Sequence, residues 1–287
     1  MFGRIDVLRG LRRLHWLRER DPVEEELRGW EWDRPPVRPR AYLGLGVSEV
    51  AYRYCPTMRD LWLRKRRGVQ GIARGPVLRG AMLHEVFHAA ASDARRMLVL
   101  GRSGWEAYEA LASRARRRVD GLGCGEDWCV RLYKHLVLGW CAEAARAEAL
   151  MGGEGISWLP WLTEYRVDGS PLGLSRQLRV DGLGEARVVV ELKYGRPGDR
   201  HRIGLAGYAL ALEASLETPV DYGLLVYVDR FDRPTPRVRM DPVYISGDLR
   251  REFLVARDEA IDVVLGPEPP RPSSCPEHCP FREVCMG

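Results

Sequence analysis

The chain has 287 residues, of which 45% are hydrophobic and 30% charged, as in a globular protein that buries a full core in one large domain or in a domain plus a satellite. No run approaches the roughly 18 consecutive apolar residues that span a membrane, and the N-terminus lacks the apolar core of a signal peptide, so we expect a soluble cytoplasmic protein with no membrane partner. The net charge is +5 and the arginines cluster, which fits a polyanionic partner such as nucleic acid and equally fits a solvated arginine-rich surface.

The first half of the chain is predicted to be mainly helical. Residues 1–47 contain the stretch "WEWDRPPVRPR" and predict an irregular arm on the body, following at most a short helix. From Ser48 to Gly152, apolar residues recur at spacings of three and four, as in helices, and glycine and proline separate the segments. One predicted helical segment is 48–67. We assign residues 48–157 to a helical region.

The second half is predicted to form a sheet that carries helices, so the fold class is α/β. Short β-rich segments alternate with turn residues, with one helical segment before the fourth strand and another after the fifth. The predicted strands lie within residues 158–169, 172–183, 186–195, 220–230 and 237–245, and the helices within 199–217 and 247–265. This core is assigned to residues 158–265, and the proline-rich end to residues 266–287.

One segment of this half, "VVVELKYG", carries an unusual lysine. Only three of the 45 basic side chains are lysines, and one of them is Lys193. Side chains alternate along a strand, so Glu191 and Lys193 share a face. Asp181, in the preceding "LRVDG", is expected on the neighbouring strand of an antiparallel hairpin.

Two carboxylates beside a lysine suit a metal-assisted hydrolase, because hard oxygen ligands hold Mg²⁺ or Mn²⁺, which activates water. A lysine adds a compact, rotatable ammonium whose pKa burial can lower, which a guanidinium cannot offer. For the E-x-K pattern alone, an ordinary ion pair at a strand end, with Asp181 starting a turn, is the commoner arrangement.

The segment "LRGAMLHEVFHAA" contains a competing motif, H-E-x-x-H, formed by His84, Glu85 and His88. On a helix, this motif is typical of zinc proteases, with both histidines as ligands and the glutamate as general base. A zinc protease needs a third metal ligand. No second motif marks one, and the candidates are Glu106 and Glu109. The alternative uses His84 alone, as a ligand that joins Asp181 and Glu191.

Three of the seven cysteines stand close together in "SSCPEHCPFREVCMG", as Cys275, Cys279 and Cys285. Three thiolates leave a four-thiolate site incomplete, and Cys55, which is followed by proline like Cys275 and Cys279, is the candidate for the fourth. Spacing alone does not decide between zinc and an iron–sulfur cluster. The odd cysteine count argues against a disulfide framework. The remaining thiols are predicted to be buried apolar cysteines: Cys124, Cys129 and Cys141.

The order of these motifs resembles a known family. A "G-x-x-x-H-E" helix, then "VDG", then "ELK", then a helix with a central tyrosine, Tyr208, lie between one early and three late cysteines. The combination is similar to the RecB-like nucleases of the PD-(D/E)xK class. It most closely resembles the CRISPR-associated exonucleases with an iron–sulfur cluster, the fourth of the core CRISPR-associated proteins, in their longer archaeal branch.

The resemblance implies a restriction-endonuclease-like core and a set of site residues. His84, Asp181 and Glu191 would hold Mg²⁺ or Mn²⁺ with the Leu192 carbonyl, and Lys193 and Tyr208 would be catalytic. The implied ligands of a structural 4Fe–4S cluster, which would tie the two chain ends together, are Cys55, Cys275, Cys279 and Cys285.

Two positions depart from the family pattern, and a third is ambiguous. Gly204 stands where the family usually has a glutamine four residues before its tyrosine, with His201 or Arg202 as substitutes for holding phosphate. The first step between the last cysteines is one residue longer than the commonest spacing. Glu164, in "LTEYRVDG", is interpreted as a plain strand-surface glutamate rather than as a neighbour of the metal.

Three functions follow from this reading. The first is a metal-dependent exonuclease for single-stranded DNA or frayed duplex ends, which trims fragments for CRISPR spacer acquisition beside the integrase proteins. The arginine clusters, with Trp30 and Trp32, would bind the DNA. The second is a catalytically weak DNA-binding or assembly subunit, motivated by Gly204. The third is a zinc protease that depends on His88 rather than on Lys193. Self-association into a homo-oligomer is left open.

Overall fold

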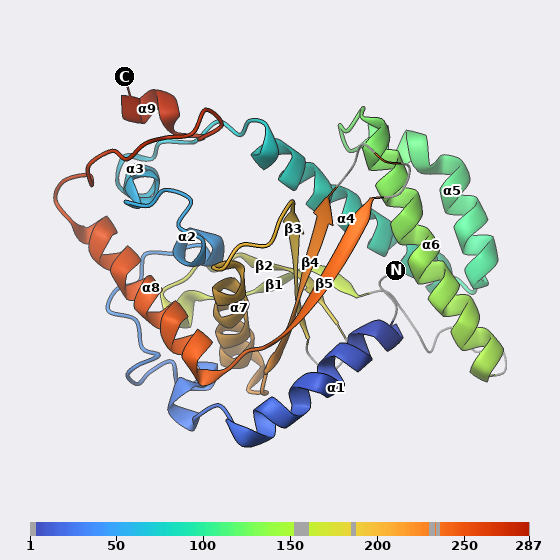
Figure 1. The fold of residues 1–287 in the computed structure, drawn as a ribbon, viewed down its shortest axis with the longest axis horizontal. Coiled ribbons are helices and arrows are strands. Elements are labelled where there is room, and N and C mark those ends of the chain that lie inside the picture. Colours follow the sequence, from blue (N-terminus) through green and yellow to red (C-terminus); the bar gives the residue numbers. More distant parts are fainter. Residues whose placement is uncertain (1–3, 152–160, 185–187, 230–232, 234–235, 287) are drawn as a thin grey trace.

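The computed structural model describes residues 4–151, 161–184, 188–229, 233 and 236–286 (Figure 1). Its α-helices are α1 Arg4–Arg20, α2 Val47–Ala51, α3 Arg59–Arg67, α4 Pro76–Val99, α5 Gly104–Asp120, α6 Asp127–Met151, α7 His201–Leu216, α8 Gly247–Leu265 and α9 Arg282–Met286. Its strands are β1 Leu162–Val167, β2 Leu178–Leu183, β3 Val189–Tyr194, β4 Tyr222–Asp229 and β5 Arg237–Tyr244. The predicted domain boundary at 157/158 and the tip of the β2–β3 connection, 185–187, lie outside the described residues.

The described strands form one mixed sheet in the order β1-β2-β3-β4-β5. β3 and β4 are parallel, and α7 connects them, whereas the other neighbouring pairs are antiparallel. Each strand lies within a predicted β-rich segment, and β2 and β3 form the predicted antiparallel hairpin. The prediction of an α/β fold with a mixed sheet and flanking helices is confirmed.

The sheet is buried on both faces by two layers of helices (Figure 1). Successive residues of β3 enter different cores: Val190 and Leu192 pack with α4 and α6, whereas Val189 packs with α7 and α8. The same alternation holds along β4, since a strand reverses side-chain direction at each residue. Because β3 is buried on both faces, its run of branched residues is explained, and its charged residues must be paired inside the molecule.

The N-terminal segment differs from the prediction of an irregular arm. α1 has 17 residues, packs along β5, and is followed by short 3-10 turns. Arg18 of α1 donates to Asp221 at 2.7 Å, and His15 lies 3.2 Å from the Tyr222 hydroxyl. This charged helix is therefore held by contacts with residues some 200 positions later, which local sequence cannot reveal.

The predicted helix 48–67 is interrupted between α2 and α3. Residues 52–58 leave the helical path, with positive φ at Arg53 (47°) and Met58 (55°). Pro56 lies between them and disfavours helix at the residue before it, Cys55. The interruption places Tyr52 and Cys55 on an irregular loop rather than on a helix face.

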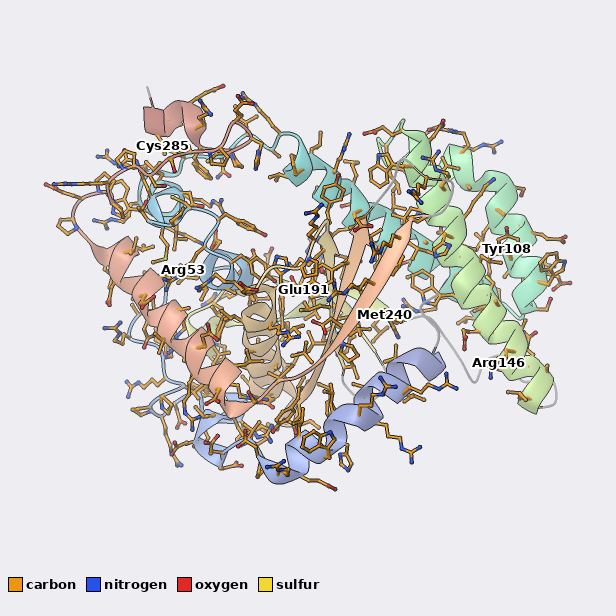
Figure 2. All side chains as sticks on the ribbon, in the orientation of Figure 1. Arg53, Tyr108, Arg146, Glu191, Met240 and Cys285 are labelled. Carbon is orange, nitrogen blue, oxygen red and sulfur yellow. A yellow bond between two sulfur atoms is a disulfide. The ribbon has the colours of Figure 1, made fainter. Side chains whose placement is uncertain are left out.

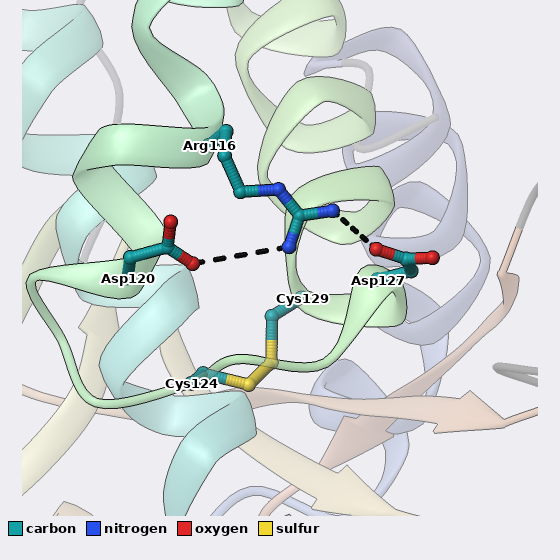
Figure 3. The surroundings of a disulfide bond; sticks show 5 residues. All are labelled: Arg116, Asp120, Cys124, Asp127 and Cys129. Carbon is teal, nitrogen blue, oxygen red and sulfur yellow. Dashed lines mark hydrogen bonds and ion pairs between the residues drawn. A yellow bond between two sulfur atoms is a disulfide. The ribbon is translucent and has the colours of Figure 1, made fainter.

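The cysteines of the helical layer also differ from the prediction. Cys124 and Cys129 are buried as expected, but they form a disulfide across the connection between α5 and α6 (Figure 3). Arg116 of α5 bridges the same connection by pairing with Asp120 and Asp127. Cys141 is buried and free. The disulfide therefore closes a local loop in a layer remote from the C-terminal cysteines.

None of the helices in the described ranges is both long and apolar enough to cross a membrane.

Candidate metal centre

Asp181 lies where strands β2 and β3 separate. The paired residues of the two strands are Gly182 with Val190 and Leu183 with Val189. Beyond Val190, the backbone N–H of Leu192 donates to Asp181 Oδ2 at 2.7 Å. The carboxylate thus takes a donor of β3 and is fixed at the point where the ladder ends.

His84 reaches the same point from helix α4, which packs against β1 and β3. Its Nδ1 lies 3.0 Å from Asp181 Oδ1. Burial alone would lower the pKa of His84, but Asp181 and, more weakly, Glu191 raise it above its usual value. Burial opposes ionisation of Asp181, yet His84 and Lys193 hold its pKa below the usual range. The pair is therefore an anionic carboxylate beside an imidazole.

Glu164, interpreted from the sequence as a plain strand-surface residue, lies in this cluster and also accepts from Arg179 at 3.3 Å. Ligand atoms of His84, Glu164 and Asp181 all lie within 4.8 Å of one another. Glu164 is opposite Asp181 in the β1–β2 register, between the pairs Thr163–Gly182 and Tyr165–Val180. Its φ of 53° is unusual for a non-glycine residue.

The strained backbone at Glu164 has a visible consequence for its neighbours. Tyr165 packs in the core beneath α7, whereas Thr163 reaches α4 and contacts His88 Nδ1 at 2.7 Å. In a regular strand, residues two apart face the same side. The left-handed residue therefore turns the strand over and directs Glu164 toward Asp181.

Glu191 is the central buried carboxylate of the molecule (Figure 2). Its Oε1 accepts from Lys193 Nζ at 2.6 Å and from the Tyr52 hydroxyl at 2.5 Å. Its Oε2 is buried and has no hydrogen-bond partner among the described residues. Burial, with the neighbouring Asp181, raises the pKa of Glu191 despite Lys193. A buried carboxylate oxygen without a partner is costly unless a ligand fills the gap.

Lys193 forms the ion pair that the E-x-K pattern allows, but inside the protein rather than at a surface. Its Nζ pairs with Glu191 and lies 3.9 Å from the centroid of the Tyr52 ring. Burial alone would lower the pKa of Lys193, but Glu191 and Asp181 raise it above the usual value. Lys193 therefore remains a cation.

Tyr208 and Gly204 lie on the side of α7 that faces this cluster. Burial, with Glu191 and Asp181, raises the pKa of Tyr208, which keeps its hydroxyl a donor. Gly204 lies against Tyr52: a Cβ at position 204 would overlap the Tyr52 hydroxyl and lie 2.9 Å from its ring carbons. The space of the expected glutamine side chain is thus filled by a tyrosine from another segment.

The two suggested substitutes for that glutamine are placed less favourably. His201 contacts the edge of Tyr52, with ring centroids 5.5 Å apart, but burial and Lys193 lower its pKa to about 4. It is therefore neutral at physiological pH. Arg202 donates to Asp241 at 3.0 Å on the surface. Neither offers a free cation next to Glu191.

The H-E-x-x-H motif is split between two environments. His88 is engaged by Thr163, and Glu85 is exposed. The ligand cluster found among the described residues contains His84, Glu164 and Asp181 but not Glu191, and also none of His88, Glu106 and Glu109. The arrangement thus uses the first histidine alone.

The four cysteines of the predicted cluster are free thiols. Burial and the charges of the Cys279, Cys285 and Cys55 thiols raise the pKa of Cys275, so each of these three thiols acts on it, although within the described ranges the cysteines do not form a group with ligand atoms all within 4.8 Å of one another. Burial opposes ionisation of Cys55, but hydrogen bonds from Thr57 and from nearby backbone N–H groups lower its pKa. Phe281 packs with Trp62 and Leu63 of α3 between these segments.

Tyr52 contacts both Glu191 and Lys193 and was not predicted from the sequence. Its only signal in the sequence is an aromatic hydroxyl three positions before a Cys-Pro step, which does not specify a contact with β3.

The Leu192 carbonyl, proposed as a ligand, lies one residue from Glu191 on the same strand, and Leu192 itself is buried.

Comparison with known proteins places the whole chain in one family. The model of the family described as CRISPR-associated exonuclease Csa1 matches residues 1–287. The CRISPR-associated exonuclease Csa1 of Thermoproteus tenax is 37% identical over 292 residues, with 100% of both chains covered. That of Saccharolobus solfataricus is 32% identical over 280 residues, with 92% of each chain covered. The resemblance drawn from the motifs is confirmed, and the chain belongs to the CRISPR-associated exonuclease Csa1 family.

Proposed function

We propose that this protein is a metal-dependent DNA exonuclease with a PD-(D/E)xK-type core, acting on single strands or frayed duplex ends. The observation that carries the proposal is the buried, unpartnered Oε2 of Glu191, whose carboxylate shares an electrostatic environment with the Asp181–His84 pair. Hard carboxylate oxygens with one imidazole suit Mg²⁺ or Mn²⁺. The residues present therefore fit such an ion, with His84, Asp181, Glu191 and Glu164 as side-chain ligands and the Leu192 carbonyl as a further one.

The chain's own residues supply binding and orientation. The bound ion would activate water and offset the charge of the scissile phosphate. Lys193, which remains protonated, donates hydrogen bonds to the attacking water or the phosphate and adds a fixed positive charge where negative charge develops. Tyr208, kept protonated, is a second donor on the α7 side.

An exposed cation at the end of β3 suits a DNA backbone. Arg79 of α4 stands five residues before His84 and donates to the Tyr194 hydroxyl at 3.3 Å. Tyr194 directly follows Lys193 on β3. Part of the arginine excess is paired elsewhere, as in the Arg118–Asp93 ion pair. Arg79 is therefore a better candidate for phosphate contact than the arginines of the run RARRR, residues 114–118 of α5.

The four cysteines are proposed to hold a 4Fe–4S cluster with a structural role. Thiolate ligands also suit zinc, so the metal is identified by its spectrum rather than by geometry. The biological role proposed is trimming of DNA fragments before integration as CRISPR spacers, beside the integrase proteins, in the cytoplasm. The family name, CRISPR-associated exonuclease, supports this assignment.

The decisive test is cleavage of end-labelled single-stranded DNA with Mn²⁺ by the wild type, Lys193→Ala and Lys134→Ala. Lys134 is an exposed lysine of α6 and serves as the matched control. We expect the wild type and Lys134→Ala to cut and Lys193→Ala to lose at least about 100-fold in rate, the scale of a lost electrostatic donor. Binding of DNA without cutting by the wild type would favour the assembly-subunit function instead. Equal cutting by all three would refute the role of Lys193.

A further inference from the structure

Tyr52 contacts both charged residues of strand β3. Its hydroxyl donates to Glu191 Oε1 at 2.5 Å, and its ring face lies under Lys193 Nζ at 3.9 Å. The residue itself is 6% exposed and comes from the loop after α2, far from β3 in sequence. A buried hydroxyl and an aromatic face are thus directed at the two residues of the E-x-K motif.

The position of Tyr52 depends on the absence of a side chain at Gly204. A Cβ there would overlap the hydroxyl and lie 2.9 Å from two ring carbons, distances that real Cβ atoms do not show. Gly204 lies inside α7, where glycine is less favourable than alanine. The helix therefore carries an unfavourable residue at the place where the tyrosine needs room.

The contact with Tyr52 affects the orientation of the Glu191 carboxylate. Lys193 and Tyr52 both donate to Oε1, one from the same strand and the other from across the core. With that oxygen held by two donors, rotation of the carboxylate is restricted, and Oε2 is left without a partner. Groups that hydrogen-bond a metal ligand in this way fix its orientation and affinity.

We propose that Tyr52, admitted by the absence of a side chain at Gly204, is a positioning residue that holds Glu191 with its free oxygen available to the metal ion. The inference rests on the proposed function, since it assigns a task within the same metal centre. It also gives a reason for a glycine at 204, which leaves the room that Tyr52 occupies. The glycine then marks a rearranged site rather than a lost one.

The first experiment measures Mn²⁺ binding without DNA, by calorimetry, for the wild type, Tyr52→Phe and Tyr108→Phe. Tyr108 lies on α5, well away from Glu191 (Figure 2), and is the matched control. Tyr52→Phe keeps the ring and removes only the hydroxyl. We expect its Mn²⁺ affinity to fall roughly 10- to 100-fold, the usual effect of removing a hydrogen bond to a metal ligand. In cleavage assays, the half-maximal Mn²⁺ concentration should rise while the KM for DNA stays unchanged.

The second experiment tests the link between the two positions with Gly204→Ala and the double variant. Alanine has a higher helix propensity than glycine, so the substitution should not destabilise α7. Its Cβ, however, displaces the Tyr52 hydroxyl. Gly204→Ala should therefore lose Mn²⁺ affinity in the same range as Tyr52→Phe. Both changes remove the same hydrogen bond from Tyr52 to Glu191. The double variant should therefore bind Mn²⁺ no more weakly than the single variant with the lower affinity, so the two effects should be strongly non-additive.

The outcomes separate this inference from the proposed function. If the wild type neither binds Mn²⁺ nor cuts DNA, the proposed function fails and the inference falls with it. If the wild type binds and cuts, but Tyr52→Phe retains wild-type Mn²⁺ affinity, only the positioning role is refuted. Additive losses in the double variant would equally refute it, because the two residues would then act independently.

Discussion

At the scale of single residues, the candidate metal centre is built from side chains that the chain brings together by local distortions. Glu164 reaches the cluster because its backbone takes a left-handed conformation opposite Asp181. Non-glycine residues in this region cost free energy, about 1–3 kcal/mol, and persist where the surrounding structure requires them. The strain therefore fits a residue that is retained for its carboxylate.

Glu164→Gln should weaken the metal centre without unfolding the protein. The amide keeps the size of the side chain but loses the negative charge, so Mn²⁺ affinity should fall by about 10-fold or more, and cleavage should need correspondingly more metal. Glu85→Gln, on the exposed side of α4, is the control and should behave as the wild type. Calorimetry with Mn²⁺ checks both. Unchanged affinity in Glu164→Gln would restore the interpretation of a surface glutamate.

The sequence predicts part of this centre but not all of it. Strand alternation places Glu191 and Lys193 on one face, and the short hairpin brings Asp181 beside them, because both rules are local. Glu164 and Tyr52 could not be predicted in the same way. One depends on a backbone conformation that breaks the strand pattern, and the other comes from an irregular loop between α2 and α3.

At the scale of elements, periodicity located the helices and strands that pack with a regular apolar pattern. The strands β1 to β5 and the helices α7 and α8 lie within their predicted segments. The length of α1 was not predicted, because this highly charged helix is held mainly by distant contacts. The break between α2 and α3 was missed, because the periodic pattern continues across Pro56 although the helix does not.

The attachment of the N-terminal elements to the core depends on Asp221. This buried carboxylate accepts from Arg18 of α1 and from Arg28, which also pairs with the buried Glu213. Burial opposes its ionisation, but the two arginines hold its pKa below 3.8. Because the folded-state pKa is depressed, the stabilisation is complete at neutral pH and is lost as the pH falls below about 4.

Asp221→Asn should therefore destabilise the protein by about 3 kcal/mol at pH 7, since it leaves the buried Arg28 without one of its anionic partners. The difference in the free energy of unfolding between wild type and variant should shrink at pH 3, where the unfolded wild-type chain binds a proton at this carboxylate. Urea unfolding at both pH values measures this. Asp248→Asn, at an exposed position of α8, is the control. An equal difference at pH 7 and pH 3 would show that the charge of Asp221 is not what matters.

At the scale of the whole molecule, the region around Cys55 and the C-terminal segment are held together. Trp62 Nε1 donates to the Gly266 carbonyl at 3.1 Å, Arg59 donates to the Pro270 carbonyl at 2.8 Å, and the Ile72 N–H donates to the Pro280 carbonyl at 3.0 Å. α3 and α9 lie close to each other at one edge of the molecule, away from α5 and α6 (Figure 1). The proposed cluster would join these same two segments covalently through its thiolates.

The cysteine region is also connected to the metal centre through a short piece of chain. Tyr52, which contacts Glu191, is three residues before Cys55, and the loop between them has few regular backbone hydrogen bonds. A metal cluster bound at Cys55 would therefore restrain the loop that carries Tyr52. Loss of the cluster is expected to act on the candidate metal centre through this restraint and not through electron transfer.

Cys279→Ser tests this connection, with Cys141→Ser as the control outside the cysteine cluster. In protein purified without oxygen, the wild type and Cys141→Ser should show the broad visible absorbance of an iron–sulfur cluster, and Cys279→Ser should lose most of it. Hydrogen exchange should then rise in residues 266–286 and in α3, and Mn²⁺ affinity should fall in the direction of the Tyr52→Phe variant. If the wild type is colourless and contains stoichiometric zinc, the metal held by these thiolates is zinc and not an iron–sulfur cluster. Faster exchange with unchanged Mn²⁺ affinity would show that Tyr52 is held by its contacts with Glu191 and Lys193 alone, independently of the cluster.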